Sequence, residues 1–464
     1  MPLFGPPSIS KLQAKGDTAG LLKVLRSRKD ADERREAAVA LGVLADARAI
    51  GPLIGTLRDS NQEVVQAAID ALVQFGPDAL TPLLAALGDE DYRYRAASAW
   101  ALGQISEDLY DSTLRWRSTE MLIASLRDDH ELVREASARA LARTADPRAV
   151  KPLRDVLSDS HAVVRIAAAF ALAQIGMTSN EESVRRQVAA QLAIALEDSD
   201  VNVRQTAARA IGDVGAGLQN GDLKDSVMTR LGAALNDPDP AVGSAVADAL
   251  GSVADGRAVR PLFNMGLSQD AEKELRDRAL EAIVRIGAPA VDELEPMLLS
   301  IDHTVRDQAA NILDRIGWIP DQGREAAAYW LAKRKWDKCI ALGEPAADVL
   351  AVEIASDDPE TRVRAGEALV SIGEPAVDAI LRLLGDDDAS IRERAAELLD
   401  QIGWEPCPDE AGAIYWVTKG CWNQALEIGP SAIRPIVRAL RIGDFNTRQA
   451  AAYALETSLL LEAD

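Results

Sequence analysis

Aromatic residues, histidines, cysteines and long apolar segments are all scarce in this chain. Of its 464 residues only 4% are aromatic and only 3 are histidine. The cysteines Cys339, Cys407 and Cys421 are too few for a disulfide framework and too scattered for a zinc site. The chain also lacks an apolar run of about 18–20 residues, the length that a membrane-spanning helix requires. We therefore expect no metal, no other cofactor and no membrane insertion.

Positive charge is in deficit as well. The chain has 51 lysines and arginines against 73 aspartates and glutamates, a formal net charge of −22. A field of this sign repels the phosphates of DNA and RNA, so we expect no nucleic-acid partner. The first residues, 1–10, lack the basic flank and apolar run of a secretory signal. Together with the few cysteines, this predicts an acidic cytoplasmic protein with reduced thiols.

The chain has, in place of these features, one phrase repeated from end to end. The phrase V-R-x-A-A-x-x-A-L-x-x-I-G is represented by Val164–Gly176 and again by Val305–Gly317. A second apolar stretch, such as Ala149–Leu157, precedes each phrase and is joined to it by a short Asp-rich turn. Both stretches have helical spacing, so each repeat is predicted to be a pair of helices, which we call A and B.

Aligning the last residue of each B helix gives about twelve repeats. Most spacings are 30–33 residues, three are 39 and two are 56. The aligned residues are Ala45, Gly76, Ser106, Ala145, Gly176, Gly215, Ala254, Gly287, Gly317, Gly373, Gly403 and Leu459. A closing glycine suits a helix end that adopts the left-handed conformation. Stacked helix pairs bury one continuous core, so we predict an all-α solenoid without separate globular domains.

One arginine recurs near the start of most B helices. It is found at Arg34, Arg95, Arg134, Arg165, Arg204, Arg276, Arg306, Arg362, Arg392 and Arg448. Aspartates recur at the A-to-B turns, at Asp59, Asp128, Asp159, Asp198, Asp237 and Asp386. Because both series keep their place in the repeat, we predict a ladder of ion pairs that joins successive repeats. Its alternative is a set of solvent-exposed charges worth under about 1 kcal/mol per pair.

This pattern resembles the HEAT-repeat family, and most closely its short prokaryotic branch named after phycobilisome (PBS) lyases. The resemblance implies a right-handed superhelix of the armadillo type, with B helices lining the concave side. Two groups of enzymes share the fold. The two-iron site of deoxyhypusine hydroxylases uses several His-Glu dipeptides, whereas this chain has only His130–Glu131. The bilin lyases leave an enzymatic alternative open, in which this chain is a lyase or an enzyme-maturation subunit.

The two 56-residue spacings arise from one insertion that is used twice. Residues 318–343 and 404–429 match each other at an offset of 86 and contain six of the eight tryptophans. We expect each insertion to form one broken helix or two short helices. The aromatic residues either wedge these helices against the solenoid or form a secondary platform for a partner. The candidates for that platform are Tyr329, Trp330, Trp336, Tyr415, Trp416 and Trp422.

The position five residues after the ladder arginine points away from the core of each B helix. On four successive repeats it is occupied by Trp100, Arg139, Phe170 and Arg209. Gln104, Arg143 and Gln174 lie one turn further along the same stripe. In an acidic molecule this cationic and aromatic strip suits an acidic or extended peptide. The structural alternative is that neighbouring side chains simply cover Trp100 and Phe170.

The domain organisation follows from the repeats. We predict a single solenoid over residues 1–464, with an N-terminal cap at residues 1–16 and a candidate hinge at residues 216–224, which contain glycine and asparagine. The predicted function is non-catalytic: a scaffold or adaptor that binds one or more proteins along the concave face of the B helices.

Overall fold

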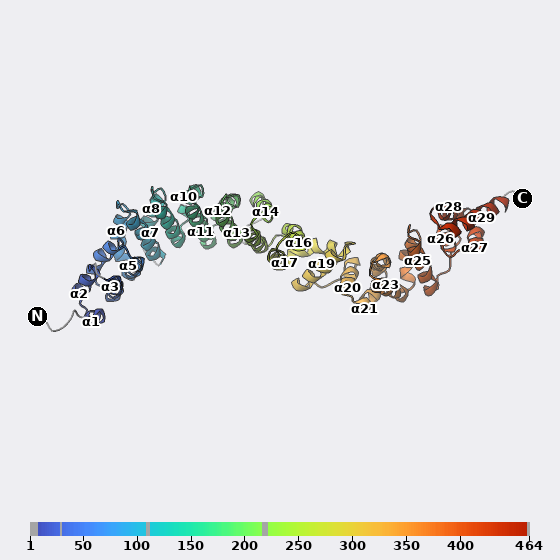
Figure 1. Ribbon diagram of the computed structural model, residues 1–464, viewed down its shortest axis with the longest axis horizontal. Helices are drawn as coiled ribbons and strands as arrows, with labels where there is room; N and C mark the ends of the chain where they lie inside the picture. Colours follow the sequence, from blue (N-terminus) through green and yellow to red (C-terminus); the bar gives the residue numbers. More distant parts are fainter. Residues whose placement is uncertain (1–7, 28–29, 108–111, 216–220, 462–464) are drawn as a thin grey trace. The chain divides into compact units, whose positions relative to one another are not determined.

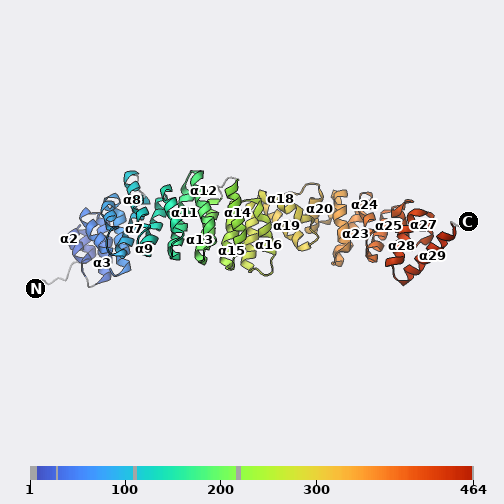
Figure 2. The ribbon, with the colours of Figure 1, turned by 90° about the horizontal axis from the view of Figure 1, so that it is seen from above.

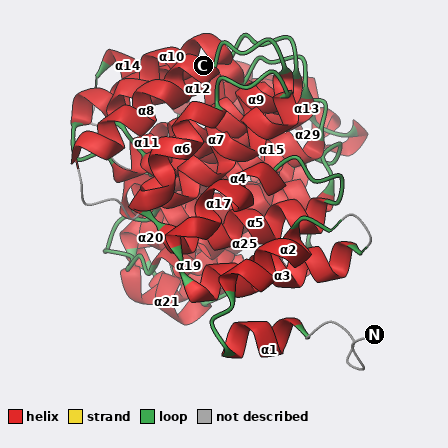
Figure 3. Cartoon of the chain, turned by 90° about the vertical axis from the view of Figure 1, so that its left-hand side faces the viewer, coloured by secondary structure: helices red, strands yellow, loops and turns green. Residues whose placement is uncertain are grey.

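All regular structure that we observe is helical. The computed structural model describes residues 8–27, 30–107, 112–215 and 221–461. Within these ranges the chain forms α-helices and short 3-10 helices, with loops between them and no strand (Figure 3). The predicted all-α solenoid is therefore confirmed. Among the described helices none is long and apolar enough to cross a membrane.

The chain forms two compact units, Met1–Pro289 and Ala290–Asp464. We call them the N-terminal and the C-terminal unit. The candidate hinge at 216–224 falls within the N-terminal unit, and its residues 216–220 lie outside the described residues. The following helix α14, Asp222–Ala234, packs against α12 and α15 of the same unit. A single uninterrupted solenoid over the whole chain stays a prediction.

The N-terminal unit consists of α1, Ile9–Ala14, and eight helix pairs. Residues 1–7 of the predicted cap lie outside the described residues, and α1 packs on α2 and α3. The A helices are α2 Thr18–Leu25, α4 Ile50–Thr56, α6 Pro77–Ala86, α8 Ser112–Ser125, α10 Val150–Val156, α12 Glu182–Ala195, α14 Asp222–Ala234 and α16 Val259–Leu267. The B helices are α3 Ala31–Leu44, α5 Gln62–Phe75, α7 Tyr92–Glu107, α9 Glu131–Thr144, α11 Ala162–Thr178, α13 Val201–Gly215, α15 Pro240–Val253 and α17 Lys273–Ile286.

The A and B helices of this unit form two layers. Figure 1 shows α6, α8, α10, α12 and α14 along one side and α7, α11 and α13 along the other. Successive B helices contact each other more extensively than successive A helices do. The B layer is therefore the inner, more tightly curved layer of the unit.

The repeated phrase forms the core of the B layer. In α11 the apolar residues at −1, +3, +7 and +10 from the ladder arginine are Val164, Ala168, Leu172 and Ile175, all of them completely buried. At 100° per residue these positions share one face of a helix. Small residues allow close approach of neighbouring helices, since a side chain at Gly103 would lie 2.6 Å from the Cα of Ala140.

The closing residues confirm only part of the left-handed prediction. Gly317 and Gly403 adopt the left-handed conformation, with φ of 83° and ψ of 25° and with φ of 81° and ψ of 31°. Gly76 and Gly287 also have positive φ, but their ψ of −129° and −133° lies outside the left-handed helical region. Gly176, by contrast, lies inside α11, which continues to Thr178. A side chain at Gly176 would lie 2.8 Å from Val214, so this glycine serves helix packing rather than a turn.

The predicted ladder is present in the N-terminal unit. Each rung is a bidentate pair, as in Arg165, whose Nε and Nη2 donate to Asp198 of the next repeat at 2.8 and 2.7 Å. Nη1 of the same arginine donates to the carbonyl of Asp159 in its own turn, at 2.9 Å. The rungs are Arg34–Asp59, Arg95–Asp128, Arg134–Asp159, Arg165–Asp198 and Arg204–Asp237. Each arginine therefore ties its own turn to the next one.

The ladder has a gap at α5, where Val65 stands in the arginine position. There Asp89 of the next turn is bound by Arg58 of the preceding turn instead. The contact between α5 and α7 is also the least extensive between successive B helices of this unit. From α7 onward the rungs are consecutive as far as Asp237.

The C-terminal unit has four helix pairs and two insertions. The pairs are α18 Val291–Leu294 with α19 His303–Ile316, α22 Glu344–Val352 with α23 Pro359–Ile372, α24 Val377–Leu383 with α25 Ala389–Ile402, and α28 Ile433–Ile442 with α29 Phe445–Leu461. The insertions form α20 Arg324–Ala332 with α21 Trp336–Leu342, and α26 Glu410–Thr418 with α27 Trp422–Glu427. Each insertion is thus two short helices, and α20 lies between α19 and α23 in Figure 2. The predicted number of about twelve helix pairs is confirmed.

Candidate functional site

The strip predicted from the sequence lines a groove on the B layer of the N-terminal unit. Its volume is about 850 Å³, and it is bounded by α7, α9, α11 and α13. The structure brings six of the seven predicted residues into its lining: Trp100, Arg139, Arg143, Phe170, Gln174 and Arg209. The seventh, Gln104, is half-buried on α7 one turn beyond Trp100 and does not line the groove.

The aromatic residues of the groove are accessible. The side chain of Phe170 is 47% exposed, although its neighbours Ala169 and Ala171 are completely buried. Trp100 is half-buried, and the guanidinium of Arg143 lies over its indole ring at 5.6 Å from the centroid. A neighbouring side chain therefore covers Trp100 in part, as the structural alternative expected, whereas Phe170 stays open.

The three arginines of the groove differ in their partners. Arg143 Nη1 pairs with Glu107 Oε2 at 2.6 Å, and Arg139 Nη2 pairs with Glu135 Oε1 at 2.8 Å. Arg209 is exposed, and no described carboxylate lies within ion-pair distance of it. Exposed ion pairs are worth less than about 1 kcal/mol, so an incoming carboxylate competes with them at small cost. The guanidinium of Arg209 can bind an incoming carboxylate without first giving up an ion pair.

Two acidic residues in the lining were missed by the sequence analysis. Asp213 lies nine residues after the ladder arginine Arg204, the same position in the repeat as Gln104, Arg143 and Gln174. Extending the series Gln104, Arg143 and Gln174 to the next repeat would have identified Asp213. Glu107 lies at the end of α7, just before residues outside the described ranges, and the repeat pattern gave no signal for it. The groove therefore carries mixed charge, with three arginines and two carboxylates in its lining.

The secondary candidates lie in the two insertions, and they fall into buried and accessible residues. Tyr329 and Tyr415 are 6% and 5% exposed. Each tyrosine hydroxyl donates to an aspartate of the preceding B helix, Asp314 or Asp400. Trp330, Trp336, Trp416 and Trp422 are half-buried. The tyrosines thus brace the insertions, and a partner platform made by the tryptophans stays a prediction.

The bracing network is the same in both copies. Lys333 and Lys419 bind the same two aspartates as the tyrosines do. The tyrosine rings also stack edge-to-face with two tryptophans each, at centroid distances of 4.9 to 5.4 Å. Burial, together with the hydrogen bond to the carboxylate, raises the pKa of each tyrosine to about 12. The aspartates were missed in the sequence, although they too match at an offset of 86.

One cysteine of the first insertion is buried among apolar residues. Burial raises the pKa of the Cys339 thiol to about 12, so this thiol is not a nucleophile at neutral pH. No group of three or more potential metal ligands occurs among the described residues. Among the described residues, the groove on α7, α9, α11 and α13 presents aromatic and basic side chains that are suited to binding.

The HEAT-repeat family model matches residues 18–103, 119–192, 188–266 and 347–419, more than half of the chain. The chain therefore belongs to the HEAT-repeat family, and the resemblance seen in its sequence is confirmed. Among curated proteins no sequence matches this chain.

Solved structures with a similar fold differ widely in role. Yeast importin-beta is 14% identical over 97% of this chain and 70% of its own, with a TM-score of 0.50. An engineered protein is 22% identical over 95% of this chain and 98% of its own, with a TM-score of 0.33. The complex of CpcE and CpcF of phycocyanin lyase from a Nostoc species gives 26% identity over 36% of this chain and 99% of that chain, with a TM-score of 0.32. The likeness to importin-beta shows the helical solenoid fold alone.

Proposed function

We propose that this protein is a non-catalytic scaffold that binds a protein partner in the groove on α7, α9, α11 and α13. The observation that carries the proposal is Phe170, an aromatic side chain that is 47% exposed in the lining of a groove to which Arg139 and Arg209 also contribute. Aromatic residues and arginines are the residue types that most often dominate binding energy at protein interfaces. HEAT-repeat proteins as a class bind other proteins, which supports the same function.

The chemistry of the groove favours an extended segment that carries acidic and apolar side chains. Arg209 and Arg139 lie on either side of Phe170 in the series of repeats, so alternating contacts are available along the groove. The chain as a whole is acidic, and this limits binding to partners that present their negative charge locally. We expect the protein to act in the cytoplasm, without nucleic acid and without a cofactor.

The test compares groove variants with a control variant at the same position of another repeat. The tagged protein is used to capture partners from the cells that produce it, and the dominant partner is then titrated by calorimetry. Trp100→Ala and Arg139→Ala should each weaken that partner by about 1–2 kcal/mol or more, with the helical circular dichroism unchanged. Val39→Ala removes a side chain that is also 47% exposed and has the same place in the first repeat, and it should have no effect.

Two outcomes would contradict this proposal. Equal affinity in the parent, Trp100→Ala and Arg139→Ala would exclude the groove as the binding site. A coloured eluate with the absorbance of a bound bilin, without a partner of this kind, would instead support the second candidate, a maturation subunit of the bilin lyase type.

A further inference from the structure

The C-terminal unit contains one segment twice. Residues 300–362 and 386–448 correspond at an offset of 86, and their helices begin at corresponding positions, as α19 and α25 do. Each copy comprises a B helix, a tryptophan-rich insertion and the next helix pair up to the start of its B helix. The first copy therefore shows how the second is built, residue by residue.

In the first copy a buried ion pair closes the junction around the insertion. Nη2 of the ladder arginine Arg306 donates to Glu353 Oε1 at 2.6 Å, and the side chains are 6% and 2% exposed. Nη1 of Arg306 donates to the carbonyl of Ser300 at 3.2 Å. His303 contacts the same guanidinium, and Arg334 Nη1 donates to Thr361 Oγ1 at 2.5 Å. Three side chains, His303, Arg334 and Glu353, thus occupy this junction.

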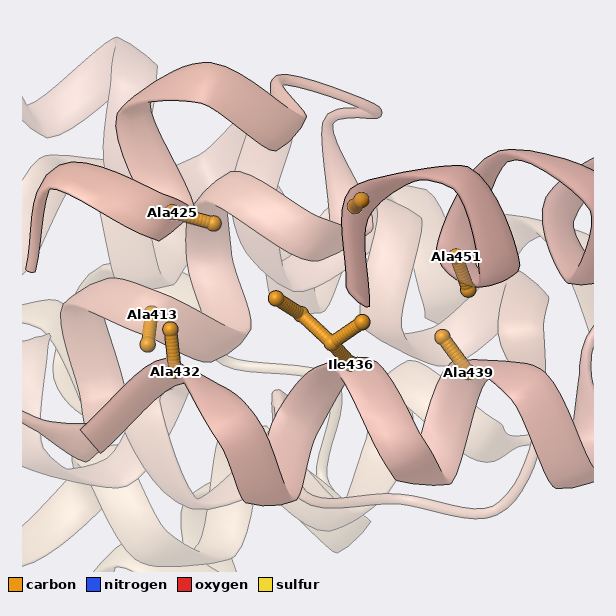
Figure 4. Close-up of a cluster of buried hydrophobic side chains, with 7 residues drawn as sticks. Ala413, Ala425, Ala432, Ile436, Ala439 and Ala451 are labelled. Carbon is orange, nitrogen blue, oxygen red and sulfur yellow. The ribbon is translucent and has the colours of Figure 1, made fainter. Parts of the chain in front are cut away.

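In the second copy all three of these side chains are lost. The corresponding residues are Ala389, Gly420 and Ala439. They line a cleft of about 660 Å³ between α25, α26, α28 and α29. A side chain at Gly420 would meet no atom within 4 Å, which shows how open the cleft is at this point. Figure 4 shows Ala439 on the buried cluster of the last repeat, facing Ala451 of α29.

The arginine of the pair is retained without its carboxylate. Arg392 corresponds to Arg306, and its Nη1 donates to the carbonyls of Asp386 and Asp387 at 2.9 and 2.8 Å. Among the described residues no carboxylate forms an ion pair with Arg392. Burial and the nearby guanidinium of Arg438 lower the pKa of Arg392. Asp386, Asp387 and Asp388 act on Arg392 from a distance and oppose this lowering. A carboxylate in ion-pair contact is therefore missing at the place where Glu353 supplies it in the first copy.

The other groups of the cleft limit what enters it. Asp387 pairs with Arg438 at 2.7 Å, Asp388 caps α25 by accepting the Ser390 amide, and Asp444 accepts the Thr447 amide. Glu393 lines the cleft as well. Four carboxylates at the rim disfavour a multiply charged anion such as a phosphate. The apolar lining by Ile414, Val417 and Trp422 instead favours a single carboxylate on a short apolar stem.

We propose that the cleft between α25 and α29 binds a carboxylate of a second molecule, in the place that the Glu353 side chain holds in the first copy. The carboxylate accepts hydrogen bonds from Arg392, and its stem packs against Trp422. The side chain of a glutamate in a partner segment and a free small carboxylic acid share this chemistry. The site lies in a different unit from the groove of the proposed function and does not depend on it.

The experiment follows the indole signals of protein labelled with [15N]tryptophan by nuclear magnetic resonance. The signal of Trp422 is assigned with Trp422→Phe, and Trp336, at the same place in the closed first copy, serves as the internal control. Butyrate and the peptide acetyl-Gly-Glu-Gly-amide are the carboxylate probes, and butyramide and the corresponding glutamine peptide are their uncharged counterparts. Ionic strength is kept constant throughout.

We expect both carboxylate probes to shift the Trp422 signal saturably, while the uncharged probes leave it in place and Trp336 does not respond. Arg392→Gln should weaken the apparent affinity about tenfold or more, because a charge-assisted hydrogen bond is lost. Ala439→Glu retains Arg392 and places a carboxylate of the protein itself beside it. This carboxylate should occupy the site, so the probes should no longer shift the Trp422 signal. Tighter binding of the peptide than of butyrate would identify the source as a partner's glutamate, and the reverse order would identify a small acid.

Three results would overturn the proposal. They are an equal response to charged and uncharged probes, a response of Trp336 that matches that of Trp422, and unchanged binding in Ala439→Glu. The last does not depend on the stability of Arg392→Gln, since Ala439→Glu keeps the contacts of Arg392 with its turn.

Discussion

The two units use the same position of the repeat in opposite ways. Eight residues after the ladder arginine the N-terminal unit has glycines such as Gly42 and Gly103, which let the next B helix approach closely. At the same position the C-terminal unit has Asp314 and Asp400, which bind the tyrosine and lysine of an insertion. Glycine at this position lets the next B helix approach closely, whereas aspartate at this position binds an inserted helix pair.

The ladder differs between the units for a related reason. In the N-terminal unit each arginine reaches an aspartate in the next turn, and side chains of both partners remain 7–15% exposed. In the C-terminal unit an insertion intervenes, and Arg306 reaches instead a glutamate buried at 2% exposure. The ion pair of Arg306 is more completely buried than the N-terminal pairs, so we expect the loss of this arginine to destabilise the fold more.

The largest effect is expected from Arg306→Leu. It leaves the carboxylate of Glu353 buried without its partner, and breaking a buried ion pair from one side costs about 3–5 kcal/mol. The double variant Arg306→Leu/Glu353→Leu removes both charges and should lie much closer to the parent. Urea unfolding followed by tryptophan fluorescence measures this, because six of the eight tryptophans lie in the insertions. A single variant as stable as the parent would refute the comparison.

A smaller loss is expected when one rung of the N-terminal ladder is weakened by Asp198→Asn. Burial raises the pKa of Asp198, but hydrogen bonds from Arg165 and the Asp200 amide outweigh it, and the net pKa lies below its usual value of 3.8. A lowered pKa stabilises the fold above the unfolded pKa, and this stability is lost as pH falls through the folded pKa. We expect a loss of about 1.5–3 kcal/mol at pH 7, which shrinks as the pH falls through the lowered folded pKa of Asp198.

The control for this rung is Asp155→Asn. Asp155 pairs with Arg154 on the surface, where the side chains are 57% and 42% exposed. Such a pair contributes less than about 1 kcal/mol. Urea unfolding by circular dichroism at pH 7 and pH 3 compares the two variants. Equal losses of unfolding free energy at pH 7 would mean that a ladder pair stabilises the fold no more than an ordinary surface pair does.

The smallest effects concern the turn inside each insertion. Arg334 and Gly420 occupy the same place in the two copies and have φ of 56° and 69°. Gly420→Ala should cost about 1 kcal/mol, because only glycine adopts this conformation freely. Arg334→Gly relieves a similar strain and loses the hydrogen bond to Thr361, so its net effect should stay within about 0.5 kcal/mol. Thermal unfolding of both variants measures the difference, and a large loss in Arg334→Gly would contradict this balance.

Periodicity predicted the fold well, because the chain contains the same pattern about twelve times. The buried positions around Arg165 and the ladder pairs of the N-terminal unit follow from residues that recur. For each insertion the sequence allowed one broken helix or two short helices, and the structure has two short helices. The groove was also predictable, since Trp100, Arg139, Phe170 and Arg209 deviate from the pattern at one position that points outward. Whether a partner binds there is a matter of chemistry that the sequence leaves open.

What escaped prediction depends on contacts that cross the pattern. Asp314 and Asp400 matter only because an inserted tyrosine and lysine reach back to them. Glu353 lies 47 residues from Arg306 and outside the ladder positions, so no spacing rule connects them. The cleft beside Arg392 arises from three side chains that are absent, and a missing partner is visible only where the folded first copy can be compared with the second.

The gap in the ladder at α5 has a mechanical consequence. A solenoid under tension behaves as springs in series, and extension concentrates in the softest one. The α5–α7 joint, with Val65 in place of an arginine and the least extensive B-helix contact, is that spring within the N-terminal unit. The groove lies on α7 to α13, across consecutive rungs. Each spring in series carries the same force, so we expect a pull on the unit to lengthen the α5–α7 joint more than the joints that carry the groove.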